Sequence, residues 1–419
     1  MSSMKEIAAK MKMAAPQLAV SSHEQRNNAL KAVKEALLLN KDVIFEANHK
    51  DMDAAEANHI APAVMKRLKF DEGKLADVCG GIDQLVSLED PLGKLSLARE
   101  LDDGLTLYRV SVPIGVIGII FEARPDALVQ ISSLCIKSGN CAILKGGKET
   151  VNTNKVLFDI IHKAVMDAGL PEYAFHQATL HNEIDELLAC EKDVDLLIPR
   201  GSNQFVQYIM NNTKIPVMGH ADGVCHIYVD KDADMAKALP IIVDAKTQYT
   251  AACNAVETLL VNRAIANDFL PMLADACKEA GITIRGTQEV AGMIPCEVMT
   301  EEEFHTEYLD LIISVKLVDS VEEAISHINY YGSHHTDCII TENDETAVIF
   351  MEMVDSAGVY RNCSTRFADG FRYGFGAEVG ISTSKLHARG PVGLEGMVTY
   401  KYKLQGDGHI VGDYASGKR

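Results

Sequence analysis

Cys253 is the residue whose surroundings best suit a nucleophile. It lies among small residues, in Thr250-Ala251-Ala252-Cys253-Asn254-Ala255, just before an apolar run that predicts a strand. Small neighbours leave a thiol accessible and let backbone N–H groups approach it, as the tetrahedral adduct of a covalent mechanism requires. The alternative is a half-buried cysteine with a packing role, since the chain contains ten cysteines and most structural cysteines are inert.

Two turns that follow apolar strands have the composition of phosphate-binding segments, in which glycines admit a close backbone approach and cations complement the charge. Neither has the spacing of a P-loop or of a G-x-G-x-x-G fingerprint. Ordinary turns with solvated lysines, and a simple helix cap in the second, are therefore open alternatives. The carboxyl edge of a parallel sheet is nevertheless where open α/β folds bind ligands. The turns comprise Lys145, Gly146, Gly147 and Lys148, and Arg200, Gly201 and Ser202.

Charged residues also follow the longest apolar run of the chain, at Glu122, Arg124 and Asp126. At the carboxyl end of a strand they would face the same crevice, and arginine is the side chain best shaped for carboxylate or phosphate. An ion pair between Glu122 and Arg124 on a rim is the alternative.

A polar segment between two apolar strands, residues 219–226, contains four potential metal ligands. Their spacing matches no zinc signature, so no metal site is predicted. The four are His220, Asp222, Cys225 and His226. A second histidine-rich segment, His334-His335, follows a glycine and is predicted to be a loop tip.

The order of apolar patterns predicts an α/β fold. The first ninety residues are expected to be helical, with a capping box from Ser21 to Glu24 and helices near residues 51–69 and 73–86. Residues 105–110 alternate like an exposed strand, whereas residues 112–121 form a continuous apolar run typical of a buried parallel strand. Strands and helices then alternate, which predicts a doubly wound sheet with helices on both faces. Strands are expected at 142–144, 195–198, 216–218, 226–229, 257–261, 311–317 and 338–340, and helices at 154–168, 203–210, 267–280, 320–330 and 343–354.

Length and charge narrow the class of protein further. A chain of 419 residues fits two or three domains. The net charge of −19 argues against nucleic acid and against an anionic membrane surface as partners, because both need a basic face. No apolar run reaches the roughly 20 residues of a membrane span. The cysteines form no C-x-x-C pair, which favours reduced thiols and a cytoplasmic enzyme.

Five segments, in this order, resemble the aldehyde dehydrogenase superfamily over residues 5–402. The segments are 113–126 (beginning Pro113-Ile114-Gly115), 138–147 (Ser138-Gly139-Asn140 onward), 219–226, 252–258 (Ala252-Cys253-Asn254-Ala255-Val256-Glu257-Thr258) and 374–380 (Gly374-Phe375-Gly376-Ala377-Glu378-Val379-Gly380). The resemblance implies a Rossmann-type cofactor domain (residues 1–100 and 113–234), an α/β catalytic domain (235–390) and a small β oligomerisation arm (101–112 and 396–419). We place the boundary between the two large domains near residues 230–236.

The resemblance also implies roles for individual residues. Cys253 occupies the nucleophile position, and the backbone around Asn254 would bind the oxyanion. Lys145 matches the lysine that reaches the adenosine ribose, and Glu307 the glutamate that holds the nicotinamide ribose. The turn at Arg200, Gly201 and Ser202 matches the one beneath the pyrophosphate.

Three departures from the superfamily pattern indicate which reaction is favoured. Hydrolytic members carry a glutamate that activates water, and here that place falls near Gly219-His220, with no carboxylate. An enzyme that hands a thioester to hydride should not activate water against it, so the absence favours reduction of an acyl phosphate. Arg124 stands near the usual oxyanion asparagine and would stabilise either an oxyanion or the phosphate. Lys148 stands where members that prefer NAD have a glutamate, which predicts NADPH as the cofactor.

Within the superfamily the chain is most similar to the branch that reduces L-glutamate 5-phosphate to L-glutamate 5-semialdehyde with release of phosphate, the second step of proline biosynthesis from glutamate. The reaction would proceed through a thioester on Cys253 and require no metal. Candidate substrate-binding residues are His220, Arg361 and Asn362. Alternatives are an NAD(P)-dependent dehydrogenase of another small aldehyde and a non-catalytic cofactor-binding scaffold.

The same resemblance implies partners. Strands near residues 105–110 and 398–402 would pair chains into a homo-oligomer, because an exposed edge strand is a pairing template. The helical N-terminal region is too short for a fused kinase, so a separate glutamate 5-kinase chain is expected as a transient partner.

Overall fold

The computed structural model describes residues 3–60, 62–180, 182–219 and 222–417. The chain divides into two compact units. Unit 1 comprises Met1–Met218, Phe375–Gly380 and Val392–Arg419, and unit 2 comprises Gly219–Gly374 and Ile381–Pro391. The boundary thus lies before strand β7 (Cys225–Val229) and not near residues 230–236, because β7 hydrogen-bonds to strands of unit 2 on both sides.

Five helices open unit 1: α1 (Met4–Ala19), α2 (His23–Leu39), α3 (Lys41–Ala57), α4 (Pro62–Leu68) and α5 (Glu72–Ser87). Helix α2 is capped by Ser22, one residue after the predicted position, and its hydroxyl accepts a hydrogen bond from the Gln25 N–H. The single helix expected over residues 51–69 is two helices. The first helix, α3, is followed by two hydrogen bonds outside the regular helical pattern, from His59 N to Glu56 O and from Ile60 N to Ala55 O. His59 itself has a left-handed backbone, with φ +54°. This Schellman geometry satisfies the terminal carbonyls and turns the chain away.

A parallel sheet in the order β5-β4-β3-β6 forms the centre of unit 1. Its strands are β3 (Val116–Phe121), β4 (Cys141–Lys145), β5 (Phe175–Ala178) and β6 (Leu196–Arg200), connected through α6 (Pro125–Ser138), α7 (Val151–Asp167) and α8 (Glu183–Leu188) and followed by α9 (Asn203–Asn211). Every residue of β3 and β4 is buried, as the apolar run predicted. Residues 216–218 make only an isolated bridge, between Val217 and Leu197, and not the expected strand.

Gly115 divides the apolar run 112–121 into two strands of different sheets. Its φ of +135° turns the chain between β2 (Leu105–Pro113) and β3. A Cβ at this position would lie 2.1 Å from Asp195 Oδ2, which accepts a hydrogen bond from Val116 N. Only glycine therefore fits, because it tolerates both the backbone angle and the carboxylate.

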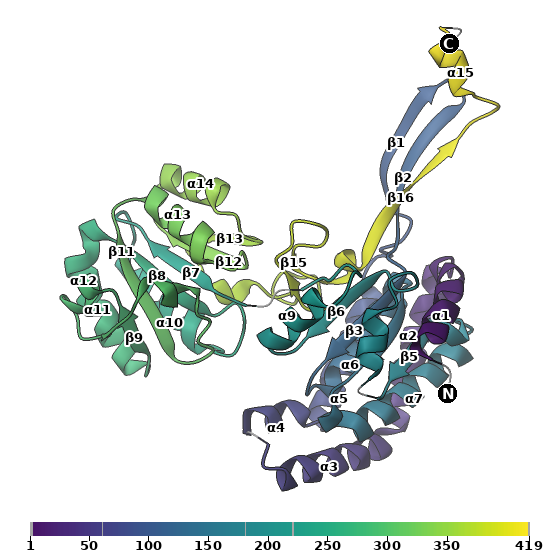
Figure 1. Ribbon diagram of the computed structural model, residues 1–419, viewed down its shortest axis with the longest axis horizontal. Helices are drawn as coiled ribbons and strands as arrows, with labels where there is room; N and C mark the ends of the chain where they lie inside the picture. Colours follow the sequence, from purple (N-terminus) through teal and green to yellow (C-terminus); the bar gives the residue numbers. More distant parts are fainter. Residues whose placement is uncertain (1–2, 61, 181, 220–221, 418–419) are drawn as a thin grey trace. The chain divides into compact units, whose positions relative to one another are not determined.

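An antiparallel three-stranded arm completes unit 1 in the order β1-β2-β16, with β1 (Leu95–Asp102) and β16 (Val398–Gln405) at its edges, followed by α15 (Val411–Ala415) (Figure 1). Strand β2 contains the stretch expected to be an exposed pairing strand. It is instead the central strand, because β16 returns from the far end of the chain to pair with it from Val398 to Gln405. The edges available to another chain are those of β1 and β16.

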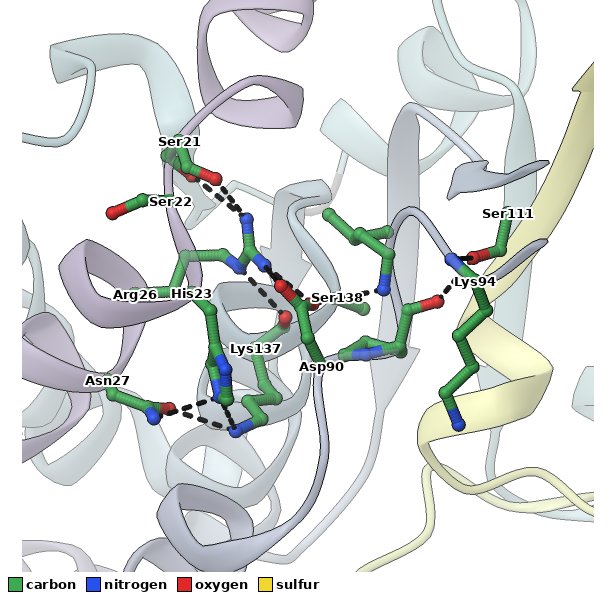
Figure 2. A network of polar contacts seen from close by, with 12 residues as sticks. Ser21, Ser22, His23, Arg26, Asn27, Asp90, Lys94, Ser111, Lys137 and Ser138 are labelled. Atoms are coloured by element: carbon green, nitrogen blue, oxygen red, sulfur yellow. Dashed lines mark hydrogen bonds and ion pairs between the residues drawn. The ribbon is translucent and has the colours of Figure 1, made fainter.

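A buried polar network holds the segment that leads into the arm (Figure 2). Arg26 of α2 donates to the Lys137 carbonyl of α6 and to both carboxylate oxygens of Asp90 (2.6 and 2.7 Å). Lys137 Nζ donates to Asn27 Oδ1 and to the Leu88 carbonyl. Burial lowers the pKa of Lys137 to about 8. The network therefore ties two helices to residues 88–90, which precede β1.

Unit 2 is a doubly wound domain around a seven-stranded parallel sheet, in the order β10-β9-β11-β8-β7-β12-β13. Its strands are β7, β8 (Val256–Asn262), β9 (Thr283–Gly286), β10 (Glu297–Val298), β11 (Ile312–Val318), β12 (Thr336–Ile340) and β13 (Gly358–Arg361). Its helices are α10 (Met235–Thr247), α11 (Ala266–Glu279), α12 (Gln288–Ala291), α13 (Val321–Tyr331) and α14 (Asp344–Met353), and β14 (Ile381–Ser382) pairs with β15 (Gly390–Pro391).

The two faces of this sheet bury separate apolar cores. Alternate residues of β7 and β8, such as Ile227 and Leu259, pack with α10 and α11, whereas Tyr228 and Leu260 pack with α13 and α14 (Figure 1). Helices on both faces confirm the predicted α/β class. None of the described helices combines the length and the apolar character that crossing a bilayer requires.

Candidate active site

Cys253 and His335 meet at the amino edge of the unit 2 sheet. Cys253 lies three residues before β8, and His335 immediately precedes β12. Because these strands are parallel members of one sheet, both side chains reach the same edge. His335 Nε2 lies 3.2 Å from Cys253 Sγ, and His335 Nδ1 lies 2.9 Å from Thr336 Oγ1. His335 is buried, so the prediction of a loop tip was wrong.

This pair has the geometry of an activated thiol. A cysteine is a good nucleophile only as the thiolate, and a histidine within hydrogen-bond reach can hold the displaced proton. The contact between His335 Nδ1 and the Thr336 hydroxyl orients the ring, so that Nε2 faces the sulfur. Cys253 is partly exposed, which leaves the thiol accessible.

Neighbouring residues hold the predicted nucleophile loop, residues 248–255 between α10 and β8, closely against the sheet edge. A Cβ on Gly223 would lie 2.1 Å from the Cys253 carbonyl oxygen, so the predicted polar segment passes directly over the nucleophile backbone. Cys225 Sγ donates to that carbonyl (3.3 Å). Asn254, which is buried, donates from Nδ2 to the Ala368 carbonyl (2.7 Å). Asn254 therefore ties the loop to residues 364–369.

A buried ion pair connects the two ends of the nucleophile loop. Lys246, in the last turn of α10, and Glu257, the second residue of β8, are 2.6 Å apart, and neither side chain has exposed surface. Burial raises the pKa of Glu257 to about 7, against the opposing effect of Lys246. Glu257 Oε1 also accepts a hydrogen bond from Leu309 N (3.4 Å), two residues after Glu307. The pair thus positions both Cys253 and the segment that carries Glu307.

Arg366 is a buried cation beside the nucleophile loop that the sequence analysis missed. It lies in a short 3-10 turn, Thr365–Phe367, and is 9 % exposed. Its Nε donates to Gln248 Oε1 (2.9 Å), and its guanidinium lies over the Tyr249 ring at 5.9 Å. No local sequence pattern distinguishes this arginine from the others, because its importance comes from a contact with a loop more than a hundred residues away.

In unit 1 the carboxyl ends of the strands gather the predicted cofactor residues. Lys145 is the last residue of β4 and nearly buried, and burial lowers its pKa. Its Nζ donates to the Gly146 carbonyl (2.8 Å). A Cβ on Gly146 would lie 2.1 Å from Asn154 Nδ2, so this turn requires glycine. Lys148 follows on the exposed surface.

The second glycine turn lies at the carboxyl end of β6. Arg200 ends that strand, and Ser202 is the N-cap of α9 without a side-chain capping bond. Instead Ser202 N donates to Glu122 Oε2 (3.2 Å), and a Cβ on Gly201 would lie 2.6 Å from the same oxygen. Arg124 pairs with Asp126 (3.3 Å) and not with Glu122, and its side chain is 43 % exposed. These residues belong to unit 1, whereas Cys253 belongs to unit 2.

Two of the proposed substrate residues lie away from the nucleophile. Arg361 ends β13, and Asn362 follows it, so both are at the carboxyl edge of the sheet, opposite Cys253. Arg361 pairs with Asp344 (2.7 Å), and Asn362 hydrogen-bonds to both backbone groups of Thr341. These contacts stabilise a turn, and we do not retain the two residues as substrate ligands. His220, the third, lies outside the described residues.

The other members of the polar segment 219–226 have structural contacts. His226 is fully buried, and its Nδ1 lies 3.0 Å from Asp337 Oδ1. The Cys225 thiol donates its hydrogen bond to the Cys253 carbonyl oxygen. In the part of the chain that the structure describes, no group of three or more histidine, cysteine or acidic side chains is arranged to hold a metal ion.

Comparison with known proteins identifies strong similarities. The model of the aldehyde dehydrogenase family matches residues 2–291. The chain is 55% identical over 413 residues to a protein of Acetivibrio thermocellus named gamma-glutamyl phosphate reductase, covering 99% of this chain and 96% of the relative. A protein of Synechocystis named gamma-glutamyl phosphate reductase 1 is 54% identical over 414 residues, with 99% and 96% covered.

Solved structures show the same relationship. The crystal structure of gamma-glutamyl phosphate reductase from Thermotoga maritima superposes with a TM-score of 0.95 at 38% identity, covering 98% of this chain and 100% of that one. An acetylating aldehyde dehydrogenase from Geobacillus thermoglucosidasius, at 17% identity and a TM-score of 0.65, covers 97% of both chains and shares the fold.

Proposed function

This chain belongs to the aldehyde dehydrogenase family and is an oxidoreductase, and from that premise we propose that it reduces L-glutamate 5-phosphate to L-glutamate 5-semialdehyde with release of phosphate. This is the second step of proline biosynthesis from glutamate. The full-length identity to proteins named gamma-glutamyl phosphate reductase supports this substrate. The observation that carries the proposal is the contact between Cys253 Sγ and His335 Nε2 at 3.2 Å.

The covalent step begins with proton transfer from the Cys253 thiol to His335 Nε2. The sulfur attacks the carbonyl carbon of the acyl phosphate, an S–C bond forms, and the C–O bond to phosphate breaks. Phosphate leaves with the bonding electron pair, and a thioester remains on Cys253. Because phosphate is a good leaving group, the step depends mainly on the nucleophile, and the histidine supplies the thiolate it needs.

The second half of the reaction returns the enzyme to its starting state. The reduced nicotinamide cofactor, when bound, supplies a hydride to the thioester carbon. The resulting oxyanion lies beside the backbone N–H groups of the nucleophile loop, which stabilise it. When the C–S bond breaks, the aldehyde leaves and Cys253 regains its proton from His335. In the resemblance to the superfamily, the water-activating glutamate of hydrolytic members aligns with Gly219-His220, where this sequence has no carboxylate.

The residues of unit 1 fit a dinucleotide. Gly146 and Gly201 are the glycines of the two turns at the carboxyl ends of β4 and β6, where Asn154 and Glu122 pack against them, and this edge of an open α/β sheet is where a dinucleotide binds. Ser202 is the N-cap of helix α9, and its N–H donates to Glu122 Oε2, so a pyrophosphate bound at this helix start would take the place of that carboxylate. Lys145 would reach the adenosine ribose. Glu307, for which the resemblance implies a contact with the nicotinamide ribose, belongs to unit 2.

NADPH is the cofactor we propose. Lys148 is exposed beside the ribose-binding turn, and a cation there would complement a 2′-phosphate. Glu149, the next residue, lies against Gly147, and its carboxylate accepts a hydrogen bond from Ala123 N (2.6 Å). The exposed lysine is the group that we propose for an incoming ribose phosphate.

We further propose that the chain forms a homo-oligomer through its arm and receives its labile acyl phosphate from a separate glutamate 5-kinase. The open edges of β1 and β16 support the first proposal. The chemistry of an acyl phosphate, which water destroys, supports the second.

The reverse reaction tests the proposed function. The chain is incubated with glutamate 5-semialdehyde, inorganic phosphate and NADP⁺, and formation of reduced nicotinamide is followed by absorbance. We expect reduction that depends strictly on phosphate, because only phosphate resolves the thioester. Reduction that proceeds equally without phosphate would mean that water resolves it, and a dehydrogenase of another small aldehyde would then be the better assignment.

Cys253→Ala is the matched control for this assay. The variant should show no turnover, while its affinity for NADPH, measured by fluorescence, stays within a few-fold of the wild type because the cofactor residues are unchanged. Turnover in the variant would overturn the assignment of the nucleophile.

A further inference from the structure

Arg366 is a buried cation that forms no ion pair with a described carboxylate, while Asp369 and Asp244 act on it from farther away. Its guanidinium is 9 % exposed, and its side chain makes one hydrogen bond to a described residue, the neutral amide oxygen of Gln248. Burying a charge without a counter-charge is costly, and natural proteins accept the cost mainly where a ligand supplies the missing charge. The environment of Arg366 therefore indicates an anion-binding site.

The turn that carries Arg366 is fastened to both ends of the nucleophile loop. Gln248, at the start of the loop, accepts from Arg366 Nε (2.9 Å), and Asn254, directly after the nucleophile, donates to Ala368 O (2.7 Å). Two contacts, one on each side of Cys253, fix the guanidinium relative to the sulfur. All of these residues belong to unit 2.

Electrostatic effects also connect Arg366 with the nucleophile. Burial lowers the pKa of Arg366, the nearby Arg372 lowers it further, and Cys253 acts in the opposite direction. Arg372 contacts Asp369 at 3.6 Å, with both side chains about one-third exposed. Arg366 thus lies close enough to Cys253 for their charges to interact, and the carboxylates of Asp369 and Asp244 act on it from beyond ion-pair distance.

We propose that Arg366 binds the phosphate group of the acyl phosphate, and inorganic phosphate in the reverse direction, beside Cys253. This inference rests on the proposed function and names the residue that recognises the leaving group. The phosphate is attached to the carbon that the sulfur attacks, so an anion site near Cys253 is placed for it. The planar guanidinium can donate two parallel hydrogen bonds to phosphate oxygens.

The proposed role changes the charge balance of the first step. As the S–C bond forms and the C–O bond breaks, negative charge grows on the departing phosphate oxygen. Arg366 neutralises this charge without giving up a proton, because a guanidinium stays protonated. The phosphate then leaves as the free ion, and the thioester remains on Cys253.

Arg366→Gln tests this role in the reverse assay, in which phosphate and aldehyde are separate substrates. Loss of a charge-assisted double hydrogen bond should raise the KM for phosphate by about 10- to 100-fold. The KM for glutamate 5-semialdehyde should stay within about two-fold, because the aldehyde contacts do not change. Arg366→Lys should restore part of the phosphate affinity, since it keeps the charge but loses the planar fork.

A second measurement needs no turnover. Inorganic phosphate should slow the alkylation of Cys253 by iodoacetamide in the wild type, and this protection should disappear in Arg366→Gln. Arg263→Gln is a matched control. Arg263 lies at the opposite edge of the sheet, after β8, in surface ion pairs with Glu289 and Asp319, so its loss should leave phosphate protection unchanged.

The outcomes separate the alternatives. If Arg366→Gln raises the KM for the aldehyde and leaves that for phosphate unchanged, Arg366 binds the substrate α-carboxylate and the proposal is overturned. A lower melting temperature with both KM values and the protection intact would show a purely structural role and would also overturn it. If the wild type lacks phosphate-dependent turnover but retains phosphate protection that Arg366→Gln removes, the proposed function fails while the phosphate site stands.

Discussion

At the residue scale, our proposal depends on a group near Cys253 that can remove the thiol proton and so make the sulfur a nucleophile. A free thiol with a pKa near 8.5 is only a few per cent ionised at pH 7. His335 Nε2 is 3.2 Å from the sulfur, and the Thr336 hydroxyl orients the ring from its other side. The hypothesis of a cysteine–histidine pair has a direct consequence for the reactivity of the thiol.

Replacing His335 with glutamine should lower kcat by about 10²- to 10⁴-fold, because a general base of this kind contributes on that order. Alkylation of Cys253 at pH 7 should slow as well, because the thiol proton loses its acceptor. The rate of iodoacetamide alkylation between pH 6 and 10 measures this. His162→Gln, a change at a partly exposed position of unit 1, is the control. An unchanged alkylation profile would assign the activation of Cys253 to other groups.

Lys148 decides the preference between cofactors in our proposal. Lys148→Glu should raise the KM for NADPH by about ten-fold or more and leave that for NADH within a few-fold, since only NADPH carries the 2′-phosphate that the carboxylate repels. Steady-state kinetics with both cofactors measure the ratio. Lys31→Glu, at an exposed position of α2, makes the same charge change elsewhere in unit 1. Equal losses for the two cofactors would contradict the assignment.

At the scale of elements, the network of Figure 2 shows how a buried cation can be part of a stable core. Helix α6 carries Lys137, whose ammonium group donates to Asn27 and to the Leu88 carbonyl. Arg26 binds the Lys137 carbonyl and the Asp90 carboxylate. Two helices and the segment before the arm are thus connected through charged groups, and the stability of unit 1 should depend on pH.

Lys137→Met should change this dependence in a defined direction. The pKa of Lys137 is about 8 in the folded chain, against an ordinary value of 10.5. Between these values the unfolded chain holds a proton that the folded chain has released, so the group makes the free energy of unfolding rise with pH, by at most about 1.4 kcal/mol per unit. Below pH 8 Lys137 is protonated in both the folded and the unfolded chain, so it no longer makes the free energy of unfolding depend on pH.

Urea unfolding at pH 7.5, 8.5 and 9.5 checks the prediction. The difference in unfolding free energy between wild type and Lys137→Met should grow in favour of the wild type as pH rises across the window. Lys31→Met, at an exposed position, should run parallel to the wild type. If Lys137→Met also runs parallel, the buried ammonium does not titrate as proposed.

At the scale of the whole molecule, the arm presents a surface that one chain alone leaves open. Tyr400, Tyr402 and Leu404 alternate along the edge strand β16 and are each more than half exposed. Since successive side chains of a strand point to opposite faces, these three share one face. An apolar row on an open edge is a site where a second copy of the chain can pair.

If the chain forms the homo-oligomer we propose, Tyr402→Asp combined with Leu404→Asp should reduce it to single chains of 45.7 kDa, because a desolvated carboxylate in the interface is unfavourable. Light scattering after size-exclusion chromatography measures the mass. Lys403→Asp, on the opposite face of the same strand, should leave the assembly intact. A mass that is equal in wild type and double variant would exclude this row from the interface.

Much of the fold could be predicted because its signals are local. Adjacent residues suffice to predict the buried strand β3, the cap of α13 at Ser320 and the turns that end several helices. Helix α6 was not predicted, and in the structure nearly all of its side chains are buried, so it lacks the exposed polar face of an outer helix. The split of α3 from α4 was also missed, because a left-handed histidine and not a glycine ends α3.

The sequence by itself determined the nucleophile loop, the glycine turns at the strand ends and the α/β class, because each depends on residues close together in the chain. Only the tertiary structure decided that His335 contacts Cys253, that Arg366 lies beside the same loop and that Arg361 does not. The physical reason is sheet order. In unit 2, β7 separates β8 from β12, so the residues that meet at the amino edge come from strands distant in sequence. The spacing of residues along the chain does not predict which strands become neighbours, because that order is set only when the strands pair.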